Sequence, residues 1–91
     1  MTIDEKLYSN IYIESTGQLI IEGNVEMKGN GHIIVESGGW LTIDGGTLSN
    51  ADIVLKPGAT LEIMNGGIIE SRNGFETPVG AEVYIDEGQI L

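Results

Sequence analysis

The sequence predicts an all-β fold: a right-handed parallel β-helix of about four coils, each with 20–22 residues and three short strands. Three observations lead to this prediction. Apolar residues recur at a nearly constant step, glycines separate the short apolar stretches, and the apolar set is dominated by Ile and Val without a helical period. Residues 1–91 are expected to form a single β-helix domain.

The repeat is visible as columns of apolar residues when the chain is aligned with itself. Five such columns share one phase, which favours a coil in which each strand pairs in parallel with its equivalent one turn later. The columns are Ile11, Ile33, Ile53 and Phe75; Leu19, Leu41, Leu61 and Val83; Ile21, Ile43, Ile63 and Ile85; Ile13, Val35, Leu55 and Thr77; and, with one residue of slippage, Ile3, Val25, Leu48, Ile68 and Ile90.

Each copy of the repeat contains the same elements in the same order. The second copy, residues 33–48, starts with the triplet "IIV", turns at "ESGG", continues with "WLTID", turns at the next Gly-Gly pair and ends on a third short strand. Glycine supplies the positive φ that tight turns require. An antiparallel meander or small barrel is the alternative, but hairpins predict longer strands and do not explain the columns.

The segment 33–67, "IIVESGGWLTIDGGTLSNADIVLKPGATLEIMNGG", resembles repeats in the right-handed β-helices of large bacterial secreted and cell-surface proteins, of the pectate-lyase-like and adhesin type. This resemblance extends over almost the whole chain and implies an extracellular or cell-surface location. Proteins with this fold include polysaccharide lyases, adhesins and tailspikes, so the resemblance implies no activity. Parallel crossover connections also favour the right hand.

Charge and composition exclude several classes of function. Acidic residues number 14 against four basic ones, for a formal net charge of −10, which disfavours nucleic-acid binding and is compatible with cations or a basic partner. The chain has no cysteine, which excludes disulfides and thiolate metal sites. No apolar run is long enough for membrane insertion, and residues 1–10 lack the apolar block of a signal peptide.

An outward-facing apolar row is the strongest candidate interaction surface. In the first strand of successive repeats, the residues between the inward positions are Tyr12, Ile34, Val54 and Glu76. Three of these four are apolar although they should face water, and a contiguous apolar row is normally covered. We therefore expect an interface at Tyr12, Ile34 and Val54, formed in a homo-oligomer or with a flanking domain of the same protein. Exposed β-branched residues that only favour the strand are the alternative.

Trp40 is the candidate ligand-binding residue. It precedes the inward Leu41, so alternation places it on the outside, beside Gln18 and Thr60 on the neighbouring coils. An outward aromatic ring can stack on a sugar or anchor a partner, or it can shield the adjacent Gly38-Gly39 corner. The sequence thus leaves a glycan as one ligand class.

No catalytic, cofactor-binding or metal-binding residues are expected. Glu14 and Glu36, and likewise Glu22 and Asp44, stack on successive coils, and a solvated acidic ladder is the favoured interpretation over a Ca²⁺ site. His32 has no partner Asp, Ser or Cys at a suitable spacing in the repeat, and Arg72 is expected to be a loop residue.

The sequence therefore predicts a non-catalytic structural or self-assembly module of a bacterial secreted or surface protein. A carbohydrate-binding module that uses Trp40 is the alternative. Neither terminus offers a helix or a polar cap, so the chain is expected to be a fragment of a longer array or to pair end to end with another copy.

Overall fold

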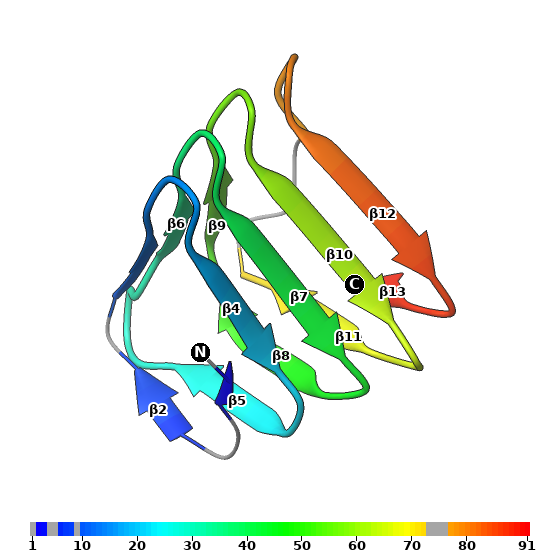
Figure 1. Cartoon of the computed structure of the whole chain (residues 1–91). Helices are drawn as coiled ribbons and strands as arrows, with labels where there is room; N and C mark the ends of the chain where they lie inside the picture. Colours follow the sequence, from blue (N-terminus) through cyan, green and yellow to red (C-terminus); the bar gives the residue numbers. More distant parts are fainter. Residues whose placement is uncertain (1, 4–5, 9, 73–76) are drawn as a thin grey trace.

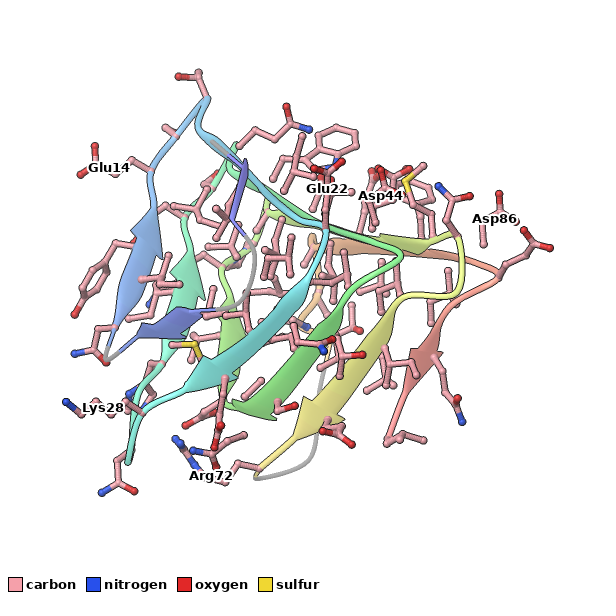
Figure 2. The ribbon with its side chains drawn as sticks, turned by 90° about the horizontal axis from the view of Figure 1, so that it is seen from below. Glu14, Glu22, Lys28, Asp44, Arg72 and Asp86 are labelled. Carbon is pink, nitrogen blue, oxygen red and sulfur yellow. The ribbon has the colours of Figure 1, made fainter. Side chains whose placement is uncertain are left out.

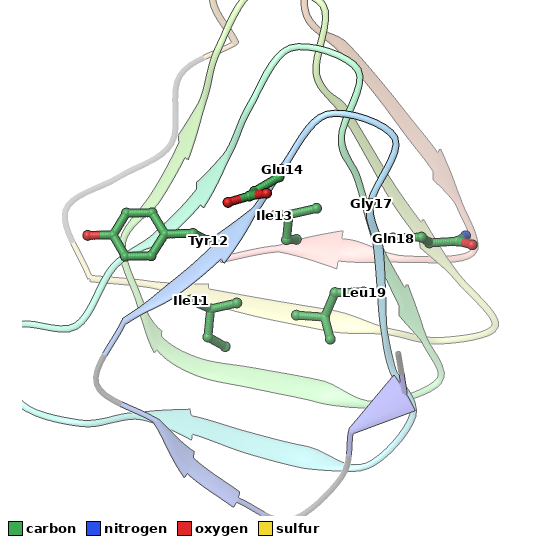
Figure 3. A pocket seen from close by; sticks show the side chains of 7 residues that line it. All are labelled: Ile11, Tyr12, Ile13, Glu14, Gly17, Gln18 and Leu19. Atoms are coloured by element: carbon green, nitrogen blue, oxygen red, sulfur yellow. The ribbon is translucent and has the colours of Figure 1, made fainter.

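The chain forms a right-handed parallel β-solenoid (Figure 1). The structure, a computed structural model, describes residues 2–3, 6–8, 10–72 and 77–91. Viewed from the N-terminal end of the solenoid, the chain winds clockwise as it recedes from the viewer (Figure 3). All strand pairs are parallel, and the three strands of a complete coil lie in three different sheets. The fold class expected from the sequence is confirmed.

Three sheets, which we term A, B and C, form the walls of the solenoid. Sheet A contains β1 (Thr2–Ile3), β4 (Gln18–Ile21), β7 (Trp40–Asp44), β10 (Thr60–Met64) and β12 (Glu82–Asp86). Sheet B contains β2 (Lys6–Tyr8), β5 (Asn24–Met27), β8 (Thr47–Ala51), β11 (Ile68–Ser71) and β13 (Gln89–Ile90). Sheet C contains β3 (Ile11–Ile13), β6 (Ile33–Val35) and β9 (Ile53–Leu55).

The number of coils differs from the expected four. Three coils have a strand in every sheet, namely β3–β4–β5, β6–β7–β8 and β9–β10–β11. The fourth copy of the repeat places β12 and β13 in sheets A and B but contributes no strand to sheet C within the described residues. Its expected first strand begins at Phe75, which lies outside them.

The core consists of the inward side chains of the three complete coils. Leu19, Leu41 and Leu61 stack in register along sheet A, and every member of this column is at most 2% exposed. Ile21, Ile43 and Ile63 are fully buried, whereas Ile85, which the sequence placed in the same column, is 52% exposed on the last strand of sheet A; in sheet C the inward Ile13, Val35 and Leu55 are buried. These columns agree with those expected from the sequence, because the parallel register repeats each position one coil later.

The column assigned to sheet B was partly wrong. Ile3 pairs with Ile21 in sheet A, not with Val25, and the buried partner of Leu48 is Ile69 rather than Ile68. The physical reason is the variable length of the corner between sheets A and B. Val25 follows Ile21 by four residues, whereas Ile69 follows Ile63 by six, so a constant step through the sequence loses the register.

The corner between sheets C and A is a tight turn that repeats in every coil. Its third residue has a positive φ at Thr16, Gly38, Gly58 and Gly80. The residue after it donates a backbone hydrogen bond to the carbonyl three positions earlier, as from Gly39 to Glu36 at 2.8 Å and from Ala59 to Lys56 at 2.9 Å. Pro-Gly at residues 57–58 fits the central positions of such a turn, since Pro fixes a negative φ and Gly accepts a positive one.

Gly46, in the corner between sheets A and B, is required for a different reason. Its φ is not in the positive region, but a Cβ at this position would lie 2.3 Å from the carbonyl oxygen of Gly23 on the preceding coil. Successive coils are only about 4.8 Å apart, which leaves no room for a side chain between the two backbones. Gly66, one coil later, has a φ of +83° and open space around it, so its requirement is conformational only.

We expect Gly46→Ala to destabilise the protein more than Gly66→Ala. The first change forces two coils apart at a backbone contact, at a cost of about 1–3 kcal/mol or more. The second leaves packing intact and costs on the order of 1 kcal/mol because of its positive φ. Chemical denaturation of both variants measures the difference, and an equal loss of unfolding free energy would contradict the steric argument.

Candidate functional site

The expected interface residues form one row on the outer face of sheet C. Tyr12 is in register with Ile34, and Ile34 with Val54, so the three side chains occupy adjacent strands. Tyr12 is 62% exposed, whereas Ile34 and Val54 are half-buried. Glu76, which would continue the row, lies outside the described residues. We refer to Tyr12, Ile34 and Val54 as the apolar row.

Trp40 lies on the outer face of sheet A, as the alternation predicted. Its register neighbours are Gln18 on β4 and Thr60 on β10, and its side chain is 39% exposed. A second aromatic residue of this face, Tyr84 on β12, is 49% exposed. It is in register with Glu62. Sheet A therefore carries two exposed aromatic rings where the sequence had indicated one candidate.

A buried hydroxyl belongs to the same outer face of sheet A, on β7 two residues after Trp40. Thr42 faces away from the core, because its neighbours Leu41 and Ile43 are the fully buried inward residues of β7. Thr42 is nevertheless only 4% exposed, and its Oγ1 has no hydrogen-bond partner among the described residues. An unsatisfied buried hydroxyl costs free energy that a valine of similar shape would not. Sequence reasoning missed Thr42, since an outward threonine on a strand is normally exposed.

Tyr84 and Glu82 interact on the same face of β12. The Tyr84 hydroxyl donates a hydrogen bond to the Glu82 carboxylate. This hydrogen bond, together with the negative charge of Glu82, raises the pKa of Tyr84 above its ordinary value of 10.0. Tyr84 is therefore a neutral hydrogen-bond donor over the physiological range, and it orients one carboxylate of the sheet A face.

Arg72 connects three successive coils at the corner between sheets B and C. Its Nη1 donates to the carbonyl oxygens of Gly29 at 2.9 Å and Asn50 at 3.4 Å. Its Nη2 donates to the carbonyl oxygen of Gly31 at 3.2 Å and to Asp52 Oδ2 at 3.4 Å. The Arg72 side chain is 19% exposed, and its guanidinium supplies donors to carbonyl groups of two other coils at this corner.

His32 also belongs to this corner, which corrects the expectation that it has no acidic partner. Its Nε2 lies 3.1 Å from Asp52 Oδ2, the same oxygen that Arg72 contacts. The spacing in the repeat concealed the pair, because His32 and Asp52 are 20 residues apart and meet only when one coil lies on the next. Asn50 completes the corner by donating from Nδ2 to the carbonyl oxygens of Met27 at 2.8 Å and Gly29 at 3.1 Å. We refer to His32, Asn50, Asp52 and Arg72 as the corner cluster.

The hydrogen bonds and ion pairs of the corner cluster hold neighbouring coils together. The donors of Arg72 and Asn50 are directed at backbone carbonyls, and Asp52 is engaged by two basic side chains. The described residues show no nucleophile in contact with His32. Such an arrangement holds successive coils in a fixed relative position. Among the described residues, it provides no group of free acidic and basic side chains that point toward one place.

Acidic side chains follow the corner between sheets A and B. Glu22 and Asp44 lie along this edge on adjacent coils and Asp86 lies two coils beyond Asp44, on the side of the molecule opposite Lys28 and Arg72 (Figure 2). Met64 separates Asp44 from Asp86 in the register. Asp44 accepts a hydrogen bond from Asn65 Nδ2 at 2.6 Å. Among the described residues, no group of three or more His, Asp or Glu side chains is placed to hold a metal ion.

A hollow of about 160 Å³ lies at the N-terminal end of the solenoid (Figure 3). Ile11, Ile13 and Leu19 point toward the interior of the coil, whereas Tyr12 and Glu14 point outward. The hollow is smaller than the roughly 300–1,000 Å³ typical of small-molecule sites, and its inner wall is apolar. The inward part of its lining belongs to the hydrophobic core, with Ile13 and Leu19 buried in it and Ile11 packed against it.

Comparison of this chain with protein-family models, curated proteins and solved structures finds no match. The described part of the chain contains no helix, and hence none with the length and hydropathy to cross a membrane. The geometry of the outer faces and of the corner cluster is therefore the basis for any functional assignment.

We expect Arg72→Lys to destabilise the fold by about 1–3 kcal/mol. An ammonium group cannot reach the four acceptors that the planar guanidinium contacts, so carbonyls of two other coils each lose one donor, although Gly29 keeps the donor from Asn50. Lys28→Gln, which removes an exposed basic side chain near the same corner, is the control and should change stability by less than about 0.5 kcal/mol. Thermal unfolding of both variants tests this, and a tolerated Arg72→Lys would show that the corner cluster is dispensable.

Proposed function

We propose that this chain is a non-catalytic structural module, a short and rigid β-solenoid that serves as a spacer and assembly surface in a bacterial secreted or cell-surface protein. The apolar row carries this proposal. It is an outward row on three adjacent strands, in a position where water would favour polar side chains. The extracellular or cell-surface location is part of the proposal and rests on the resemblance of the repeat.

The internal organisation of the solenoid agrees with a structural role. The inward side chains of its three complete coils are largely buried from water. At the irregular corner between sheets B and C, Arg72 and Asn50 donate hydrogen bonds to backbone carbonyls of other coils. Rigidity of this kind suits a spacer, because each coil contacts its neighbours through paired strands and has little freedom to move independently.

The size of the apolar row limits the strength of self-association. Three strands of three residues cover roughly 10 × 15 Å, using a rise of about 3.3 Å per residue and a strand spacing of about 4.8 Å. A standard stable interface buries about 800 Å² on each partner. The net charge of −10 also opposes the approach of a second copy. We therefore propose a weak homo-oligomer that is strengthened by salt, since salt screens the repulsion.

Ile34→Lys should abolish this association. It places a charge at the centre of the apolar row, and sedimentation velocity at high protein concentration and raised salt measures the loss of the oligomer. Ile68→Lys is the matched control, because Ile68 is a half-buried isoleucine on sheet B, away from the row. A monomer under all conditions for the unchanged protein, or equal effects of both variants, would refute the proposed interface.

A carbohydrate-binding module is the second candidate function. The exposure of Trp40 next to the polar register neighbours Gln18 and Thr60 supports it, since aromatic rings stack on sugars and polar neighbours bind hydroxyl groups. If this function is correct, a glycan array shows binding that is lost in Trp40→Ala. Tyr12→Ala serves as control, because it removes an exposed aromatic ring from a different sheet. Absence of glycan binding at millimolar concentrations would eliminate this candidate.

A further inference from the structure

We infer that the outer face of sheet A binds a basic segment of a partner protein, one that carries Lys or Arg side chains. This surface, the acidic aromatic face, consists of residues 18–22, 40–46, 60–66 and 82–88. The inference is independent of the apolar row and of the assembly proposed there, which belongs to sheet C. It rests on the segregation of charge, on the two aromatic residues and on the unsatisfied hydroxyl of Thr42.

Basic residues are absent from the acidic aromatic face, although acidic residues such as Glu14, Glu26 and Glu70 also lie outside it. The acidic aromatic face contains six carboxylates and no Lys, Arg or His; the carboxylates are Glu22, Asp44, Glu62, Glu82, Asp86 and Glu87. In the described residues, Lys6 belongs to β2 of sheet B, Lys28, His32 and Arg72 lie at the corner between sheets B and C, and Lys56 follows β9 at the corner between C and A. Figure 2 shows this separation, with Lys28 and Arg72 on one side and Glu22, Asp44 and Asp86 on the other. The field of sheet A attracts cations.

The aromatic residues lie among these carboxylates. Trp40 and Tyr84 are separated by β10, whose outward residues include Glu62, the direct register neighbour of Tyr84. Strands that are two apart lie about 10 Å from each other. A Lys or Arg side chain that contacts Glu62 is thus within reach of an aromatic ring, and a charged group over such a ring gains a cation–π attraction. We would not expect exposed aromatic rings on an acidic surface that contacts only water.

Thr42 provides an independent indication of a ligand. It faces the outside of sheet A between Ile20 and Glu62, is nine-tenths buried, and leaves its Oγ1 without a partner in the described part of the chain. The Oγ1 can accept a hydrogen bond from an N–H group, and a basic segment supplies such donors from its side chains and backbone. Entry of that donor requires the side chains that cover the Thr42 Oγ1 to move apart.

Other occupants fit this face less well. A second copy of the chain brings a net charge of −10, and nucleic acids or acidic glycans bring further negative charge to a surface that already has six carboxylates. A neutral glycan could use Trp40 but not the charge of the face. A basic protein segment uses the carboxylates, the aromatic rings and the Thr42 hydroxyl together.

The protein carries a built-in probe for the test, because Trp40 is the only tryptophan in the chain. Its fluorescence reports on the acidic aromatic face alone. Titration with a synthetic ten-residue peptide of alternating Lys and Thr should change this fluorescence in a saturable way, and raising the salt concentration should weaken binding. A peptide with Glu in place of Lys is the ligand control and should have no effect.

Matched double variants then separate a specific site from the general attraction of an acidic protein. Glu22→Gln with Glu62→Gln removes two carboxylates from the acidic aromatic face, and affinity for the Lys peptide should fall on the order of five- to tenfold. Glu14→Gln with Glu36→Gln makes the same change in net charge at the corner between sheets C and A, and each pair contains one exposed and one half-buried residue. This control should retain most of the affinity.

Thr42→Val completes the test without risk to the fold, since it replaces an unsatisfied hydroxyl by a methyl group. We expect thermal stability to be equal or higher and affinity for the Lys peptide to fall about threefold or more. The inference is overturned if the two Gln double variants lose affinity equally, if Thr42→Val binds as well as the unchanged protein, or if a neutral oligosaccharide alters Trp40 fluorescence while the Lys peptide does not.

Discussion

Parallel, in-register stacking of coils is the constraint on which the rest of this structure depends. Because each strand pairs with its equivalent about 20 residues later, every inward position recurs above itself, and so does every outward position. The inward recurrence produces dry columns such as Leu19, Leu41 and Leu61. The same spacing brings corner backbones so close that Gly46 has no room for a Cβ. Core composition and glycine placement thus have one common cause.

The corner between sheets B and C shows what happens where the repeat is least regular. Backbone carbonyls there do not all find partners in the strand ladder, and buried or half-buried carbonyls need donors. The guanidinium of Arg72 and the amide of Asn50 supply these donors across successive coils. Asp52 balances the charge of Arg72 and engages His32. Polar residues of types that are common in catalytic sites therefore serve here to hold successive coils together.

The two outer faces considered for function have opposite character. Sheet C presents a small apolar row around Ile34, which suits a weak contact with a second copy. Sheet A presents carboxylates around Trp40 and Tyr84, which suits a cationic ligand. A solenoid can carry both surfaces because its walls face different directions and share one core (Figure 1). In the module that we propose, the spacer and the binding surface are the same rigid body.

The sequence by itself determined the fold class, most of the core columns and the outward positions of Tyr12, Ile34, Val54 and Trp40, since alternation and the repeat act locally and at a constant step. It did not determine the register of Ile3 and Ile69, because corner lengths vary. Only the tertiary structure decided that His32 meets Asp52, that Arg72 reaches three carbonyls, and that the outward Thr42 is buried. Each of these depends on which side chains of neighbouring coils come together, and that is a property of stacking rather than of local pattern.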